Sequence, residues 1–187
     1  IIRNDTAKAG DLLYLTKPLG VGILTSASKK GKVTPEDLAV AVESMATLNK
    51  VGEAFAEVDG VNAMTDVTGF GLAGHLLEIC RGSGLVAKVS RKAVPVLPNL
   101  KPYIDADCIP GGTHRNAAAF GKAISGMTDA DKLLFCDPQT SGGLMVSVEE
   151  ASREAFEAIA REHGLDLQPL GRLEVAGSDE SLVFIED

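Results

Sequence analysis

Three short segments of the sequence combine glycine with hydroxyl side chains, the residue types that suit phosphate binding. They are residues 65–71 (TDVTGFG), 110–116 (PGGTHRN) and 137–143 (DPQTSGG). Glycine lets backbone N–H groups approach an anion closely, and the start of a helix adds partial positive charge. None of the segments has the Gly-Lys-Ser/Thr ending of a P-loop. Three such loops in one chain therefore favour a phosphate cleft of another kind.

Asp66 stands where a predicted strand meets a glycine-rich helix start. A carboxylate there could bind Mg²⁺ on a nucleotide phosphate, because Mg²⁺ takes one or two protein carboxylates and fills its remaining positions with water and phosphate. The alternative is that an oxygen of Asp66 or Thr68 caps the following helix. Arg115 has the same two interpretations, an anion contact through its planar guanidinium or an exposed side chain in a turn. Residues 140–141 either hold phosphate or form a hydroxyl-capped turn.

The cysteines and histidines give weaker signals. Cys80 and His75 fall in an apolar helical pattern and are predicted to lie in the core or at its boundary. Cys108 and Cys136 each adjoin a glycine-rich loop and could be nucleophiles, but no acid–base pair is recognisable beside them. The odd number of cysteines and their wide spacing argue against a disulfide framework or a zinc site. They favour reduced thiols and a cytoplasmic location.

The elements that must position the loops alternate between strands and amphipathic helices. Strands are predicted at residues 12–15, 61–65, 85–89, 144–148, 167–175 and 182–185. Helices are predicted at residues 23–30, 35–57, from 72 to a stop at 82–84, 116–124 and 149–163. This alternation indicates an α/β or α+β fold in which helices cover a mixed sheet. No long polar linker divides residues 1–187, so a single domain is expected.

Composition excludes several classes of function. The net charge is −8 and aromatic residues make up 4% of the chain, with no tryptophan. Both features disfavour a nucleic-acid-binding protein. No apolar run approaches the roughly 20 residues of a membrane span. The sequence begins at Ile1 without a methionine or a signal peptide, so we expect a processed chain or a piece of a longer one.

Four ordered motifs resemble a known family. They are residues 4–7 (NDTA) with 15–20 (LTKPLG), 64–71 (MTDVTGFG), 110–116 (PGGTHRN), and 136–144 (CDPQTSGGL). The same motifs occur in this order in selenophosphate synthetases (selenide, water dikinases), and the resemblance to their C-terminal domain spans essentially the whole chain. It implies a fold like the C-terminal domain of aminoimidazole ribonucleotide synthetase, with helices layered on a mixed sheet and partial likeness to the ferredoxin fold.

The resemblance also implies a reaction, the conversion of selenide, ATP and water to selenophosphate, AMP and phosphate with Mg²⁺, in an enzyme that is generally a homodimer. The family's nucleophile (a cysteine or selenocysteine), its partner lysine, its glycine-rich segment and most of its metal-binding aspartates belong to an N-terminal half that has no counterpart here. That half is expected to bind most of the ATP. No catalytic residue is therefore expected in this chain, and the chain alone is expected to be inactive. Asp66 corresponds to a metal ligand of the family. The candidate residues of the phosphate cleft are Thr68, Gly69, Gly111, Gly112, Thr113, Arg115, Asn116, Thr140, Ser141 and Gly142.

Two other functions remain open on the sequence. One is a domain of another ATP-dependent synthetase of the same superfamily. The other is a non-catalytic binding or interaction module.

Overall fold

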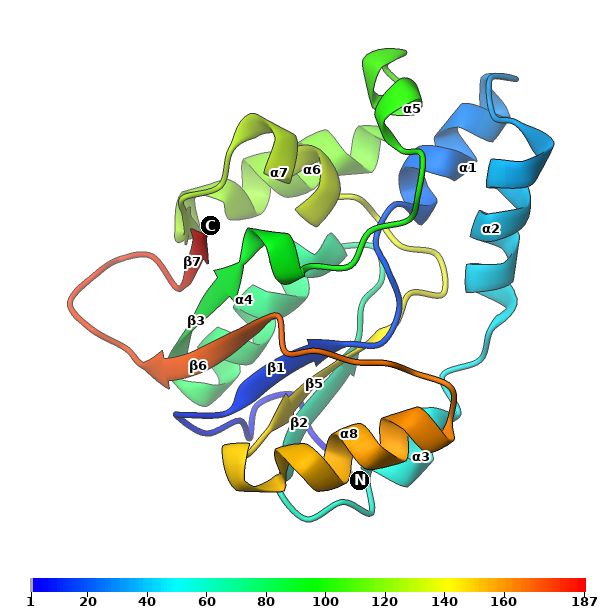
Figure 1. Ribbon diagram of the computed structural model, residues 1–187. Helices are drawn as coiled ribbons and strands as arrows, with labels where there is room; N and C mark the ends of the chain where they lie inside the picture. The colour runs from blue at the N-terminus through cyan, green and yellow to red at the C-terminus, as the bar shows by residue number, and fades with distance from the viewer. Residues whose placement is uncertain (1) are drawn as a thin grey trace.

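A computed structural model describes residues 2–187 (Figure 1). Its strands are β1 (Leu12–Leu15), β2 (Val61–Asp66), β3 (Leu85–Ser90), β4 (Ile124–Ser125), β5 (Leu144–Val148), β6 (Gly171–Val175) and β7 (Val183–Glu186). Its α-helices are α1 (Val21–Lys29), α2 (Pro35–Ala46), α3 (Val51–Phe55), α4 (Gly71–Ser83), α5 (Lys101–Asp105), α6 (Gly111–Phe120), α7 (Asp129–Phe135) and α8 (Arg153–Glu162).

The strands form one sheet in the order β2-β5-β1-β6-β3-β7-β4. The pairs β3–β7 and β4–β7 are parallel, and the other pairs are antiparallel. The predicted mixed sheet is therefore confirmed. Strand β1 lies between β5 and β6, so its partners come from the last third of the chain.

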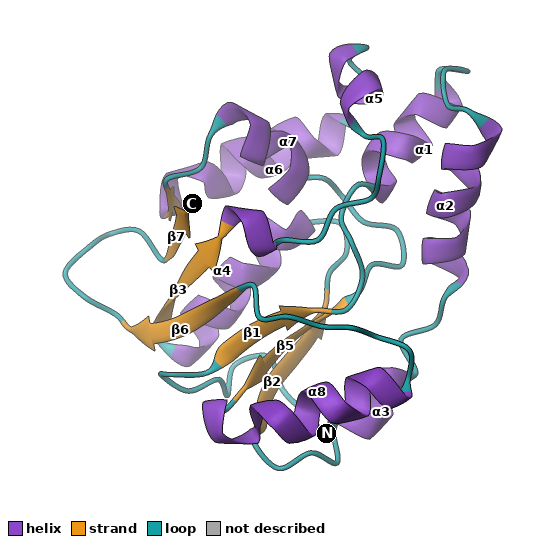
Figure 2. Ribbon diagram, viewed as in Figure 1, coloured by secondary structure: helices purple, strands orange, loops and turns teal. Residues whose placement is uncertain are grey.

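Side-chain alternation along β1 explains why helices lie on both faces of the sheet. Leu13 and Leu15 join a core that contains α4, while Leu12 and Tyr14 join a second core that contains Phe156 of α8. Every residue of β1 is buried, as expected for a strand that is covered on both faces. In Figure 2, α4, α6 and α7 stack on one side of the sheet, and α3 and α8 lie on the other.

A third cluster extends beyond the end of β1. Helices α1, α2 and α5 meet there (Figure 1) around Ile23, Leu24 and Tyr103. The hydroxyl of Tyr103 donates to Asp37 of α2 at 2.5 Å, and this bond lowers the pKa of the Asp37 carboxyl. This bond joins α5 to α2, and α1 packs against both helices in the same cluster. The start of α1 is itself bonded to the loop at residues 137–143.

The predicted helix over residues 35–57 is wrong, because the chain forms two helices there. Helix α2 ends at Ala46, and Thr47 takes an extended backbone with ψ 119°. The break brings carbonyl oxygens of Ser44 and Thr47 to the ammonium group of Lys17, and the amide of Asn49 to the carbonyl of Gly142. These contacts are tertiary, so hydrophobic spacing within the segment could not reveal them.

Three other elements begin more than two residues away from the predicted start. Helix α6 begins at Gly111 rather than at residue 116, although glycine disfavours helix. Strand β6 begins at Gly171 rather than at residue 167, and a 3₁₀ turn at residues 150–152 precedes α8. The prediction for α4 is confirmed, with Gly84 ending the helix at φ 68°. Within residues 2–187, no helix combines the length and apolar character needed to cross a membrane.

Candidate phosphate and metal site

The loop after β2 and the loop before β5 lie side by side. Strands β2 and β5 are antiparallel, with Asp66 opposite Leu144, so the end of one strand adjoins the start of the other. The N–H of Val67 donates to the carbonyl of Gly143 at 2.8 Å, and the N–H of Gln139 donates to the carbonyl of Thr68 at 3.0 Å. Two of the three predicted loops are therefore joined through their backbones.

Asn116 connects the loop at residues 110–116 to the other two loops. Its side-chain amide donates to the carbonyl of Gly69 at 2.9 Å and to the carbonyl of Cys136 at 3.0 Å. The side chain is buried, and both of its amide hydrogens are used within the protein. The structure thus brings all three loops together, and the two hydrogen bonds of Asn116 hold them in place.

Asp66 is exposed at the end of β2. It does not cap the helix that follows, since the N-cap of α4 is Phe70 and no side chain accepts a hydrogen bond there. The helix-cap alternative for Asp66 and Thr68 is therefore wrong. The carboxylate lies in a hollow of about 530 Å³ lined by residues 2–5, by Leu144 and by the end of β2. No group of three or more potential metal-binding side chains occurs among residues 2–187, so these residues do not form a complete set of metal ligands around Asp66.

A second hollow, of about 350 Å³, lies between α1 and the start of α6. Residues Thr25, Ser26 and Lys29 of α1 line one side, and Gly111 and Thr140 line the other. Pro110, the N-cap of α6, provides no side-chain acceptor for the first N–H groups of that helix. The N–H of Thr113 donates to the carbonyl of Pro110, whereas Gly111, the first residue of α6, lines the hollow. An ammonium group, hydroxyls and a helix start suit an anion. Of the predicted residues, only Gly111 and Thr140 line this hollow, and Asp66 lines the first one. The other predicted residues line neither hollow.

The remaining predicted residues differ in accessibility. Arg115 is exposed and makes no hydrogen bond or ion pair within the described residues. Thr113 is buried, and its hydroxyl has no partner in the same part of the chain. Gly69 is exposed, with open space where a Cβ would lie. Ser141 has a left-handed backbone at φ 53°, which turns the loop tightly.

Asp137, the first residue of the loop at 137–143, was not predicted as a site residue although it links that loop to α1. The carboxyl is fully buried, and its Oδ2 accepts the N–H of Gly22 at 3.0 Å and the amide of Gln139 at 2.8 Å. Gln139 in turn accepts the N–H of Val21 at 3.3 Å. Burial raises the pKa of Asp137 to about 7. The start of α1 is thus capped from within the protein and is not available to a phosphate.

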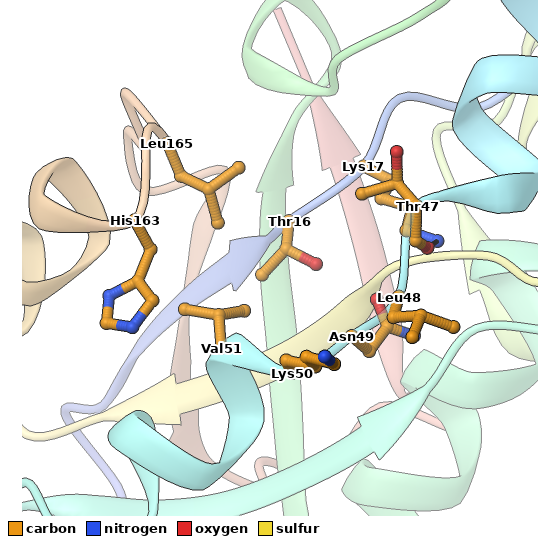
Figure 3. Close-up of a pocket in the computed structure, with 9 residues that line it drawn as sticks. All are labelled: Thr16, Lys17, Thr47, Leu48, Asn49, Lys50, Val51, His163 and Leu165. Atoms are coloured by element: carbon orange, nitrogen blue, oxygen red, sulfur yellow. Dashed lines mark hydrogen bonds between the residues drawn. The ribbon is translucent and has the colours of Figure 1, made fainter.

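Lys17 is a second residue that the sequence analysis missed. Its buried ammonium group donates to the carbonyls of Ser44, Thr47 and Ser141 at 3.1, 2.6 and 2.8 Å. No carboxylate pairs with it in the described structure, and burial lowers its pKa. A cation is favourable at the carboxyl end of α2. Figure 3 shows Lys17 beside Thr47, across a hollow from the side chains that follow α8.

Replacing Lys17 with methionine is expected to lower the free energy of unfolding by about 2 kcal/mol, because buried carbonyls lose a charged donor. The melting temperature should fall by roughly 4–8 °C, since 1 kcal/mol shifts a chain of this size by about 2–4 °C. Calorimetry measures both quantities. Lys50→Met is the matched control, because Lys50 lines the same hollow but is exposed. Equal losses in the two variants would contradict the assigned role.

The cysteines do not fit the nucleophile alternative. All three, Cys80, Cys108 and Cys136, are buried free thiols. Burial raises the pKa of Cys80 to about 12 and that of Cys136 to about 11, which keeps both thiols protonated near neutral pH. The prediction that Cys80 fills the core is confirmed.

The fold and the clustered loops define a class of protein. Residues 8–183 match the family described as AIR synthase related protein, C-terminal domain, and the chain belongs to that family. The crystal structure of thiamine-monophosphate kinase from Stenotrophomonas maltophilia covers 99% of this chain and 52% of its own, with TM-score 0.67 and 16% identity. A structure of hydrogenase maturation protein HypE in complex with ATP covers 98% of this chain and 49% of its own, with TM-score 0.67 and 24% identity. At these identities, the likeness concerns the fold alone.

A more similar relative narrows the class. The selenide, water dikinase of Colwellia psychrerythraea is 53% identical over 178 residues, which is 95% of this chain and 52% of that protein. The chain spans about half the length of the curated relatives it matches. The resemblance to selenophosphate synthetases that the four motifs indicated is thereby confirmed.

Proposed function

We propose that this chain is the C-terminal domain of a selenide, water dikinase that forms selenophosphate, AMP and phosphate from selenide, ATP and water. The observation that carries the proposal is the 53% identity to such an enzyme along 95% of the chain. The hydrogen bonds that join the three glycine-rich loops support it, because they gather the motifs that the resemblance rests on. The chain supplies no catalytic residue in this proposal and is inactive alone.

Asp66 is the metal ligand in this proposal. Its carboxylate is exposed, and it provides the hard oxygen donor that Mg²⁺ prefers. Bound Mg²⁺ would offset the negative charge that builds up on phosphate oxygens during phosphoryl transfer. Because the described residues contain no larger cluster of ligands, ATP, water and groups outside them complete the metal's coordination. The hollow between α1 and α6 holds a phosphate group against Lys29 and Thr140.

We also propose the substrates, the oligomeric state and the location of the enzyme. Selenide and ATP are its small-molecule substrates, and the full-length protein is a homodimer in the cytoplasm. The three buried free thiols support a reducing compartment. The dimer rests on the family resemblance and is checked by light scattering of the full-length protein.

The decisive experiment replaces Asp66 with asparagine in the full-length enzyme. Removing one carboxylate from the metal should lower selenide-dependent AMP formation roughly 100-fold or more, because charge stabilisation of several kcal/mol is at stake and each 1.36 kcal/mol is worth tenfold in rate. The Mg²⁺ concentration for half-maximal rate should rise. AMP release and Mg²⁺ dependence are measured together.

Asp179→Asn is the matched control, since Asp179 is an exposed carboxylate in the loop between β6 and β7. Both variants should keep the wild-type melting temperature to within roughly 2 °C, as exposed substitutions alter stability little. Wild-type turnover and Mg²⁺ dependence in Asp66→Asn would refute the metal role. Steady AMP production from selenide and ATP by the 187-residue chain alone would refute its proposed inactivity.

A further inference from the structure

His75 is a buried residue of α4 that the proposed reaction does not use. Its Nε2 atom lies 3.1 Å from the backbone nitrogen of Thr68 and 3.3 Å from the hydroxyl of the same residue. A backbone N–H can only donate, so Nε2 must accept and carries no proton. The imidazole of His75 therefore reaches back from the helix to the loop that precedes it.

Glu78 fixes which nitrogen of the ring holds the proton. Its Oε2 lies 2.8 Å from Nδ1 of His75, one helical turn further along α4. A carboxylate accepts, so Nδ1 must donate. The two contacts together select the neutral imidazole with its proton on Nδ1. Since both nitrogens are engaged and the ring is buried, His75 is neither a metal ligand nor a catalytic base in this arrangement.

The bond to Thr68 completes the fixing of the loop between Asp66 and α4. The N–H of Val67 and the carbonyls of Thr68 and Gly69 are bonded to the neighbouring loops or to Asn116. The N–H of Thr68 bonds to the imidazole instead. The ring of Phe70 lies 5.9 Å from that of His75 and helps to enclose it. Without the imidazole, the backbone N–H of Thr68, two residues from Asp66, would lose its hydrogen-bond acceptor.

We propose that His75 is a positioning residue, which holds Thr68 through its unprotonated Nε2 and thereby fixes the direction of the Asp66 carboxylate, with Glu78 selecting the required tautomer. The proposal rests on the proposed function of Asp66 as a Mg²⁺ ligand. Residues that hydrogen-bond directly to a metal ligand typically alter metal affinity or activity by 10–100-fold when they are removed, and His75, which acts through Thr68, is expected at the lower end of that range.

The test compares two substitutions in the full-length enzyme. His75→Phe keeps a ring of similar volume but has no acceptor, whereas His75→Gln places an amide oxygen near the position of Nε2. We expect His75→Phe to raise the Mg²⁺ concentration for half-maximal AMP formation by about 10-fold or more. His75→Gln should recover most of that loss. Both are measured well below the melting temperature of each variant.

A purely structural role predicts a different result, in which His75→Phe melts earlier but keeps the Mg²⁺ dependence of the wild type. That result overturns the proposal. If Asp66→Asn also leaves the Mg²⁺ dependence unchanged, the proposed function fails as well; if only His75→Phe has no effect, the proposed function stands and the positioning role falls.

A spectroscopic measurement tests the same proposal without using activity. Long-range ¹H–¹⁵N correlation spectra of the full-length wild-type protein distinguish a protonated Nδ1 from a protonated Nε2. We expect the shifts of the Nδ1-protonated neutral ring for His75, and Glu78→Gln should alter them. A ring protonated at Nε2 in the wild type would overturn the proposal whatever the activities show.

Discussion

Gly142→Ala is expected to destabilise the protein by about 3 kcal/mol or more, the upper end for overpacking in a well-packed region. A Cβ at this position would lie 1.9 Å from the carbonyl oxygen of Val67 and 2.9 Å from the Cβ of Gln139. The first of these atoms belongs to the backbone, so it cannot move without separating the loops after β2 and before β5. The melting temperature should fall by roughly 6–12 °C in a calorimetric scan.

Gly69→Ala provides the matched control in the neighbouring loop. No atom lies within 4 Å of the position that its Cβ would take. We expect a change of less than about 1 kcal/mol, since substitutions at open surface positions alter stability little. Equal destabilisation of the two variants would show that the loops are not packed as closely as the structure has them.

Asp137→Asn is expected to remove a pH dependence of stability that the wild type shows. The folded carboxyl has its pKa raised to about 7 by burial, against the ordinary value of 3.8. Above pH 4, the unfolded chain releases a proton that the folded chain retains until pH 7. The free energy of unfolding therefore decreases as the pH rises from about 4 to about 7, and this contribution is constant outside that window.

The size of this effect is at most about 4 kcal/mol, since each pKa unit corresponds to 1.36 kcal/mol. Urea denaturation at intervals between pH 4 and pH 8 measures the slope in wild type and variant. The difference between the two curves isolates Asp137 from the other titrating groups. The exposed Asp179→Asn variant should keep the wild-type slope. A wild-type slope in Asp137→Asn would contradict the assignment.

Local signals in the sequence were sufficient to predict an element when the residues of that element set its ends. Helix α4 follows from its apolar spacing and from Gly84, whose backbone at φ 68° stops it. Strand β5 follows from a short run that is apolar except for Ser147. The three glycine-rich loops were also recognisable, because glycine and hydroxyl residues between elements have a direct physical meaning.

Residues whose roles depend on distant partners could not be predicted in the same way. Lys17 is one of 18 basic residues, and only the folded chain places it among carbonyls of α2 and of the loop at Ser141. His75 was predicted only as a core or boundary residue, because its bond to Thr68 depends on how the loop turns back. The separation of Asp66 from the hollow beside α1 likewise depends on tertiary packing.

The place of β1 in the sheet has a consequence for how the protein is made. This strand precedes every other strand of the sheet along the chain, yet its two hydrogen-bonded neighbours, β5 and β6, lie more than 100 residues further on. Pairings between such distant segments cost loop entropy before they gain any contact, which slows folding. The middle of the sheet therefore closes only after nearly all of the chain has been synthesised, and until then the apolar residues of β1 need protection from aggregation.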